Sequence, residues 1–265
     1  AVIGEWRSRN APGSAAGYIA ILLDYIMDIY PYRASREPRR IGSPISAALL
    51  SISAFPPVSQ RLSVHPTHPQ LRLVRQAVAL LRAGGVIVYP TDSCYALGCG
   101  LDAFDAAARI RAIRGIDERH HLTLVCADLA QAGRYARLDN WQFRVLRQGV
   151  PGSYTFLLPA TREVPRRLKH PRRSTIGVRV PAHPVASALV AELGEPILSS
   201  SLILPGETAP LNDPDAIVVS VGKRVDAFLD SGPCAGEAST VVDLETPPGA
   251  VVRRGLGDPA ALGLA

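Results

Sequence analysis

The stretch that decides the fold is GVIVYPTDSCYALG at residues 85–98. Its apolar part, residues 86–89, has the composition of a buried strand, and Pro90 ends that strand. Thr91, Asp92 and Ser93 follow at once, so polar groups come directly after a buried strand. Because α/β proteins bind ligands where the strands of an open sheet end, this stretch predicts a binding site.

Helices and strands are expected to alternate on both sides of this stretch. Apolar residues recur at helical spacing from Pro69 until Gly84 and Gly85 end the helix. Further helices are predicted after Asp102 and Asp139 as N-caps, from Pro184 to Gly194, and after residues 213–214. Further strands are predicted at 122–126, 154–158, 175–180, 196–201, 225–229, 239–244 and 250–253. The pattern favours one α/β domain with a single twisted, mixed open sheet, helices on its faces and a basic concave cleft.

The chain of 265 residues is 47% hydrophobic and 20% charged, which predicts a globular protein. We expect residues 1–61 to be a poorly ordered extension and residues 62–265 to form the domain, because only the latter part shows sustained periodicity. The longest apolar run, 18–29, contains Asp24 and Asp28 and is shorter than the roughly 20 residues that span a bilayer. A cytoplasmic protein without a membrane partner is therefore predicted.

Charge and cysteine spacing restrict the kinds of ligand. The net charge of +6 suits a partner rich in phosphate. The four cysteines have neither Cys-x-x-Cys nor Cys-His ligand spacing, so we expect free thiols and no metal site. No G-x-S-x-G elbow is present, which disfavours a serine hydrolase of that type.

Several predicted strands are followed or ended by hydroxyl or guanidinium groups. Hydroxyls bind phosphate oxygens and carboxylates, and arginine supplies forked donors to the same anions. Turn formation and capping would explain any one of these segments by itself. The segments are residues 91–93, 153–155, 199–201 and 239–240, together with Arg179, Arg253 and Arg254.

The same segments resemble the motifs of the YrdC family of threonylcarbamoyl-adenylate synthases. Residues 90–97 resemble its P-T-[DE]-T-x-Y-G-L motif, and the Tyr-Ala-Leu variant is most similar to the YciO branch. Residues 151–155 resemble P-G-x-x-T, 177–181 resemble [GA]-[VI]-R-x-P, 199–201 resemble the start of S-x-S-A-N, 239–243 resemble S-T-V-V-D, and 252–255 resemble L-R-x-G. The resemblance runs in family order from about residue 62 to the C-terminus.

This resemblance implies condensation of L-threonine, bicarbonate and ATP to threonylcarbamoyl-AMP and pyrophosphate, for tRNA modification. Mg²⁺ is expected with the triphosphate. No residue is assigned as a certain catalytic group, and Thr91 and Arg114 are expected to position the reactants. The implied substrate-binding residues are Thr91, Tyr95, Ser199 and Ser239. The implied nucleotide-binding residues are Arg114, His120, Thr155, Arg179, Ser201, Thr240 and Arg253.

Two segments depart from the family pattern. The family's K-x-R-P-x-x-K-P-L loop corresponds to residues 114–122, where Arg114 keeps the first charge, Ile116 removes the second and His120 replaces a lysine. The family's asparagine after S-x-S-A corresponds to Ile203. Both departures resemble the YciO branch, and they leave two alternatives open: a protein that binds RNA or nucleotide without efficient synthesis, and a hydrolase of the adenylate.

Residues 162–173 form the most basic segment, with Glu163 as the only acid. Such a segment predicts salt-dependent contact with phosphates of tRNA or double-stranded RNA, although a solvated surface is an equally simple explanation. No aromatic residue in it could stack on bases, so sequence-specific recognition is not predicted. The candidate RNA-binding residues are Arg166, Arg167, Lys169, Arg172 and Arg173.

Overall fold

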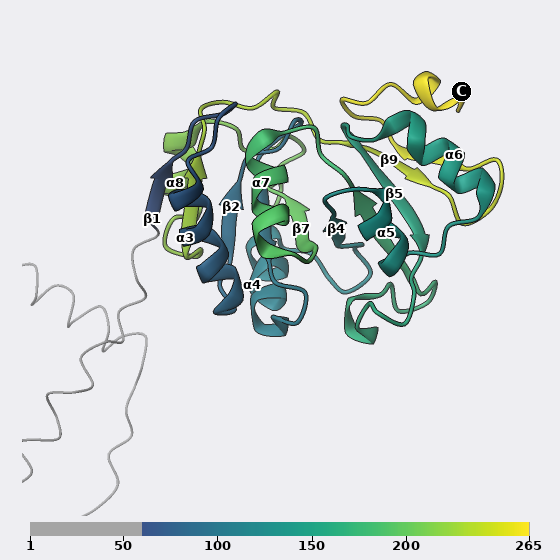
Figure 1. Ribbon diagram of the computed structural model, residues 1–265. Helices are drawn as coiled ribbons and strands as arrows, with labels where there is room; N and C mark the ends of the chain where they lie inside the picture. The colour runs from purple at the N-terminus through teal and green to yellow at the C-terminus, as the bar shows by residue number, and fades with distance from the viewer. Residues whose placement is uncertain (1–59, 265) are drawn as a thin grey trace, which may run out of the picture. The chain divides into compact units, whose positions relative to one another are not determined.

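The stretch at residues 85–98 forms two neighbouring antiparallel strands, β2 (Ile87–Tyr89) and β3 (Ala96–Cys99). The computed structural model describes residues 60–264, so the extension expected at residues 1–61 lies almost wholly outside the described residues (Figure 1). The turn between β2 and β3 is closed by Thr91, whose Oγ1 donates to the carbonyl oxygen of Cys94 at 2.6 Å. Strand β3 was not among the predicted strands, because its alternation is masked by glycine and small residues on both faces.

All ten strands of the described part form one mixed sheet, in the order β1-β8-β2-β3-β7-β4-β6-β5-β9-β10. The predicted single α/β domain with a mixed open sheet is confirmed. Strand β1 begins two residues before the expected start of the domain and pairs in parallel with β8. The other strands are β4 (Thr123–Val125), β5 (Tyr154–Pro159), β6 (Thr175–Arg179), β7 (Ile197–Ser201), β8 (Ala227–Asp230), β9 (Thr240–Asp243) and β10 (Ala250–Arg253), with β1 at Gln60–Ser63.

Six α-helices of residues 60–264 pack on this sheet. They are α3 (Leu71–Arg82), α4 (Phe104–Arg114), α5 (Leu129–Tyr135), α6 (Asn140–Gly149), α7 (Pro184–Leu193) and α8 (Pro214–Val221); short 3₁₀ helices are η2 (Arg166–Leu168) and η3 (Pro259–Leu262). Asp139 caps α6 as predicted, in a reciprocal pair with Gln142. The predicted cap at Asp102 is wrong, because the N-cap of α4 is Ala103, which makes no side-chain cap.

One face of the sheet is covered only over part of its width. Helices α3 and α7 lie side by side on it (Figure 1) and bury an apolar cluster with strands β1, β2 and β8. Going across the sheet from β1, this cluster ends at Ile197 of β7 and Val125 of β4. Beyond these two residues, neither α3 nor α7 covers the same face of β7, β4, β6, β5 and β9.

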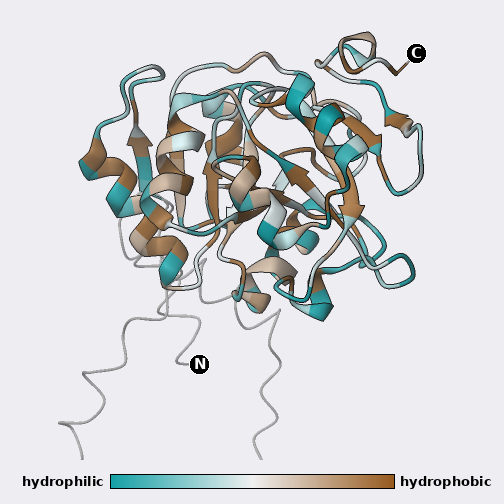
Figure 2. Cartoon of the chain, turned by 45° about the vertical axis from the view of Figure 1, so that its right-hand side comes forward, coloured by the Kyte–Doolittle hydropathy of each residue, from teal (hydrophilic) through white to brown (hydrophobic). Residues whose placement is uncertain are grey.

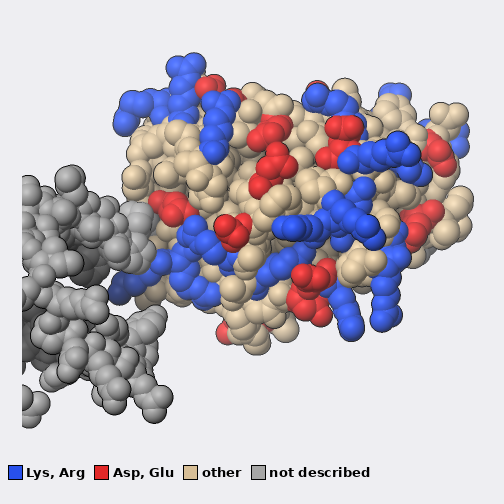
Figure 3. Space-filling model, turned by 90° about the horizontal axis from the view of Figure 1, so that it is seen from below, with Lys and Arg blue, Asp and Glu red and all other residues tan. Residues whose placement is uncertain are grey.

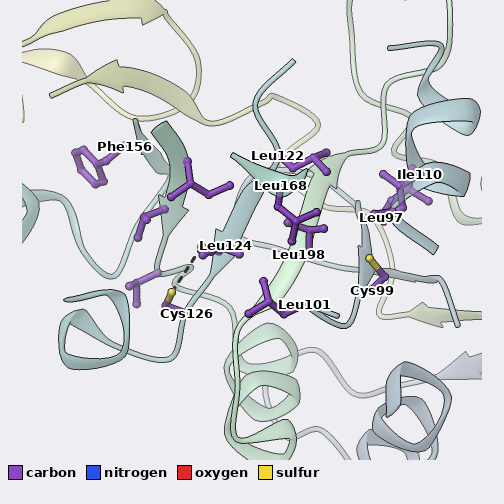
Figure 4. Packing of buried hydrophobic residues seen from close by; sticks show 14 of the residues in the cluster. Leu97, Cys99, Leu101, Ile110, Leu122, Leu124, Cys126, Phe156, Leu168 and Leu198 are labelled. Atoms are coloured by element: carbon purple, nitrogen blue, oxygen red, sulfur yellow. Dashed lines mark hydrogen bonds between the residues drawn. The ribbon is translucent and has the colours of Figure 1, made fainter. Parts of the chain in front are cut away.

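The opposite face is buried under helices α4, α5, α6 and α8. Its cluster is continuous, and Figure 4 shows part of it, including Leu124 of β4, Leu198 of β7 and Ile110 of α4. Figure 2 shows the result in hydropathy: the strands are largely hydrophobic, whereas the helices present polar residues outward. The two faces of β4 thus differ, since Leu124 lies on the apolar face, whereas the opposite face changes from Val125 to the polar Thr123.

The cysteines are free thiols, as predicted. Cys94, Cys99 and Cys126 are buried, and Cys234 is half-buried. Burial raises the pKa of Cys99 and of Cys126 to about 12, so these thiols stay protonated at neutral pH. Within residues 60–264, every helix is too short or too polar to cross a membrane.

Candidate functional site

The uncovered part of the sheet face carries a pocket of about 270 Å³. A smaller hollow of about 20 Å³ lies against it and shares with it Thr123, Thr155, Ser200, Ser201 and Ser239. The large pocket is also lined by Arg114, Arg119, His120, His121, Leu157, Val241, Val252 and Arg253. The small hollow is also lined by Thr91, Ala96, Val125, Arg179 and Ser199. We call these two hollows the outer pocket and the inner pocket.

The pleat of the sheet brings most of these side chains together. Successive residues of a strand point to opposite faces, so residues two apart share a face. Ser199 and Ser201 therefore follow Ile197 on one face of β7, and Thr123 precedes Val125 on the same face of β4. The site thus lies on an open sheet face close to the ends of several strands, since Arg179, Ser201 and Arg253 are the last residues of β6, β7 and β10.

The inner pocket is organised around Arg179 at the end of β6. Its Nη2 donates to Asp92 Oδ1 at 2.7 Å and lies 3.4 Å from Thr91 Oγ1. Asp92 also accepts a hydrogen bond from Ser153, so three separate sequence motifs meet at one carboxylate. The Arg179 and Asp92 side chains are only 6% and 13% exposed, which makes this a buried ion pair. Asp92 neutralises Arg179 and fixes its position beside Thr91.

A hydroxyl pair supports the floor of the inner pocket. Tyr89 and Ser199 hydroxyls are 2.8 Å apart, and Ser199 Oγ is 3.0 Å from the carbonyl oxygen of Leu97. Burial raises the pKa of Tyr89 to about 12, so its hydroxyl stays protonated and available as a donor. Tyr89 was read only as a strand residue in the sequence, and its contact with Ser199 needs the pairing of β2, β3 and β7.

The outer pocket is lined by the buried side chain of Arg114 and the half-buried side chain of Arg253. Arg114 Nη1 donates to Ser200 Oγ at 3.2 Å and to the carbonyl oxygen of Ser201, and Arg253 Nη2 donates to the carbonyl oxygen of Ser239 at 2.7 Å. The Nε atoms of both arginines are buried without a hydrogen-bond partner in the described residues. Burial lowers the pKa of both groups, and the nearby Arg253 adds to this for Arg114. Arginine nevertheless stays charged at neutral pH, so the pair attracts an anion.

Two histidines lie at the exposed side of the outer pocket. Burial and the neighbouring Arg114 lower the pKa of His120. Burial and the stacked ring of His170, 4.6 Å away, lower the pKa of His121 to about 4. His121 Nε2 is also 2.8 Å from Thr175 Oγ1. Both imidazoles are therefore mainly uncharged at neutral pH, and Arg119 is the one further cation in the lining of the outer pocket.

Most of the predicted site residues line these hollows, and two do not. The Tyr95 hydroxyl donates to the carbonyl oxygen of Gly232, outside both hollows. Thr240 Oγ1 donates to the carbonyl oxygen of Gly257 and accepts from the amide of Gly255. Because Tyr95 and Thr240 alternate with Ala96 and Ser239, the pleat turns them away from the pocket. Ile116 also lies outside it and packs against the large core.

Sequence reasoning missed several members of the lining and its support. Thr123 and His121 flank the buried Leu122, and the period-two pattern could have placed them on the polar face. Asp92 was noted as polar but received no role, although it joins Arg179 to the Thr91 turn. No Asp or Glu lines either hollow, so a divalent cation would have to arrive with its own anionic ligand.

The basic segment 162–173 is only partly available to a partner. Arg173 forms ion pairs with Asp243 and Glu245, Lys169 Nζ donates to the carbonyl oxygen of Thr161, and Arg167 lies over the ring of Phe104. On the face that Figure 3 shows, Lys and Arg are interspersed with Asp and Glu. RNA binding by this segment stays a prediction, with Arg162, Arg166 and Arg172 as its free cations among the described residues.

The fold and the site define an α/β protein with a basic, hydroxyl-lined anion pocket on an open sheet face. The Sua5/YciO/YrdC family model, described as "Telomere recombination", matches residues 79–255. This chain belongs to that family, and the resemblance seen in the motifs is confirmed.

The relatives include both branches seen in the motifs. The Escherichia coli (strain K12) protein YciO, described as uncharacterized, is 47% identical over 201 residues, covering 76% of this chain and 98% of YciO. A threonylcarbamoyl-AMP synthase from Halorhodospira halophila is 38% identical over 157 residues, covering 59% of this chain and 81% of the synthase. This chain therefore has substantial identity to proteins of both kinds.

Solved structures agree with the fold. The crystal structure of E. coli YciO superposes with a TM-score of 0.75 at 46% identity, covering 77% of this chain and 99% of YciO. The crystal structure of P. abyssi Sua5 complexed with L-threonine has a TM-score of 0.69 at 25% identity, covering 74% of this chain and 58% of Sua5. The fold is thus one that related proteins share.

Proposed function

We propose that this protein condenses L-threonine, bicarbonate and ATP to threonylcarbamoyl-AMP and pyrophosphate, for threonylcarbamoyladenosine modification of tRNA. The proposal rests on one observation: the two adjoining hollows differ in the charge that their side chains present to a ligand. In the inner pocket the one guanidinium is paired with Asp92, which suits a ligand group without net charge. At about 20 Å³ this pocket holds only part of an amino acid, which would continue into the outer pocket. In the outer pocket Arg114 and Arg253 have no carboxylate beside them, which suits a phosphate. The relatives named threonylcarbamoyl-AMP synthase support the same chemistry.

The reaction needs positioning more than acid–base groups. The ammonium group of threonine reacts with bicarbonate to form a carbamate, with loss of water and release of one proton to solvent. One carbamate oxygen then attacks the α-phosphorus of ATP. The bond from that phosphorus to the bridging oxygen breaks, and pyrophosphate leaves with its Mg²⁺. The carbamate is already anionic, so no side chain has to remove a proton at this step. Thr91 and Ser199 would orient the amino acid, and Arg114 and Arg253 would neutralise charge at the phosphate.

Magnesium is written here as part of the substrate. The hollows offer hydroxyls but no carboxylate to hold an ion, so the ATP phosphates would supply its ligands. Thr155 and Ser239, whose hydroxyls are 2.8 Å apart, lie in both hollows and could reach the phosphate from the sheet face. Adenosine would then extend toward Leu157, Val241 and Val252 in the outer pocket.

The direct test is incubation with threonine, bicarbonate and radiolabelled MgATP. We expect pyrophosphate and threonylcarbamoyl-AMP to appear together, and only when threonine is present. Thr155→Val should reduce this rate, whereas Thr161→Val, at a threonine outside the two hollows, should leave it unchanged. Absence of adenylate at saturating substrates, in a preparation whose folding is verified, would remove the synthase assignment.

A second candidate is a protein of the YciO type that holds nucleotide or RNA without efficient synthesis, or hydrolyses the adenylate. The uncharged state of His120 and His121 favours it, because these residues occupy the exposed side of the pocket where a triphosphate would extend. Supplying synthetic threonylcarbamoyl-AMP separates the possibilities. Hydrolysis faster than in buffer indicates a hydrolase, and stable binding without turnover indicates a binding protein.

A further inference from the structure

The outer pocket is lined by two arginines, Arg114 and Arg253, that form no ion pair with a carboxylate of the described residues. Arg114 is 9% exposed, and its guanidinium and that of Arg253 each keep one buried N–H without a partner in the described residues. A buried donor without an acceptor costs about 1–3 kcal/mol, and more when it is charged. Two such groups beside one pocket, with no Asp or Glu in its lining, indicate a site completed by an anion.

The remaining buried guanidinium does not add to this charge. The Nε of Arg179 also lacks a partner among the described residues, but Asp92 holds its Nη2 at 2.7 Å, so the pair has no net charge. The positive charge available to a ligand inside the site is therefore that of Arg114 and Arg253 alone. This matches one phosphate group, which takes up two charge-assisted partners of this kind.

The exposed side of the pocket offers no comparable charge. Its lining there consists of Arg119, His120 and His121, and the lowered pKa values leave both histidines mainly neutral at pH 7. Arg119 is exposed, so water and salt weaken its attraction. The second and third phosphates of a nucleoside triphosphate would extend to this side and would find little to neutralise them.

We propose that the outer pocket is matched to a single phosphate ester, and that it binds a nucleoside monophosphate or an acyl adenylate at least as tightly as the triphosphate. This inference rests on the proposed function only for the nucleoside part of the ligand. It assigns the adenylate as the species that the protein retains, whereas the diphosphate portion stays in solvent with its metal ion.

Calorimetric titration with AMP, ADP and MgATP at pH 7.5 tests the proposal. We expect AMP to bind the unaltered protein with a Kd equal to or lower than that of MgATP. His120→Lys should tighten MgATP binding about 2- to 5-fold, because it places a charge at the exposed side, and should tighten AMP binding by a smaller factor. The matched control is His68→Lys, which makes the same change at an exposed histidine outside both hollows.

Each outcome decides between the two proposals. MgATP binding tenfold or more tighter than AMP would overturn the single-phosphate assignment, as would an equal effect of His120→Lys on both nucleotides. Binding of neither nucleotide would overturn it together with the nucleotide part of the proposed function. Tight AMP binding without any threonine-dependent adenylate would leave this inference standing and remove the synthase activity.

Discussion

The two halves of one sheet face differ sharply in composition, although the same strands cross from one half to the other. Under α3 and α7 the face is apolar, and Ile197 and Val125 end that half. Two residues further along β7, and two residues back along β4, the same face carries Ser199 and Thr123. The difference shows that the helix cover decides which half stabilises the fold and which half binds a ligand. Truncation in each half should therefore affect different measurements.

The largest expected effect is on stability, in the covered half. Leu189 of α7 is fully buried, and Leu189→Ala should lower the free energy of unfolding by about 2–5 kcal/mol, through lost burial and the cavity left behind. Denaturant titration measures this. Ser187→Ala, on the exposed side of the same helix, should change it by no more than about 0.5 kcal/mol. If Leu189→Ala instead weakened AMP binding in the folded protein, the two halves would not be separate.

The next effect is on binding, in the open half. Arg253→Ala removes one of the two unneutralised guanidiniums, and should weaken AMP binding about 10- to 100-fold, as expected for a charge-assisted hydrogen bond. Its free energy of unfolding should change little, because the lost bond to Ser239 is offset by relief of an uncompensated buried charge. The neighbour Arg254 is exposed and outside both hollows, so Arg254→Ala serves as control. Equal losses in both variants would indicate general electrostatic attraction rather than a built site.

The smallest effect concerns pH. The folded protein holds the pKa of His121 at about 4, below the 6.5 of an unperturbed histidine. Between pH 4 and 6.5, His121 is protonated in the unfolded chain but mainly neutral in the folded protein. The free energy of unfolding is therefore highest above pH 6.5 and falls as the pH drops toward 4. The thermal midpoint should thus decline from pH 6.5 to 5, and His121→Gln should decline less. His68→Gln, at an exposed histidine, should follow the unaltered protein; an identical profile for His121→Gln would show that burial of this ring does not contribute.

The sequence was informative wherever local chemistry and chain order carried the signal. Pro90 ended a strand, Asp139 capped a helix, and the ordered motifs identified the family before any contact was known. It was less informative at short elements. Strand β3 and helix α5 were not predicted, because four and seven residues are too few for a clear period, and glycine interrupts both.

Site residues were predicted correctly where the motif and the pleat agree. Thr91, Ser199, Ser201, Ser239 and Arg253 all line the hollows, whereas Tyr95 and Thr240 belong to the same motifs and face elsewhere. A motif fixes which residues are present in a segment, but the register of a strand fixes which of them share a face. That register depends on partners far apart in the chain, such as Thr123 opposite Ser199.

The sequence by itself therefore determined the family, the α/β class and the supply of hydroxyl and guanidinium groups. Only the tertiary structure decided that the site lies on an uncovered sheet face, that Asp92 neutralises Arg179, and that Arg114 and Arg253 remain without a counter-charge. The physical reason is that residue type and local propensity depend only on a residue and its neighbours in the sequence. Burial, helix cover and the neutralisation of charge depend on which distant segments meet.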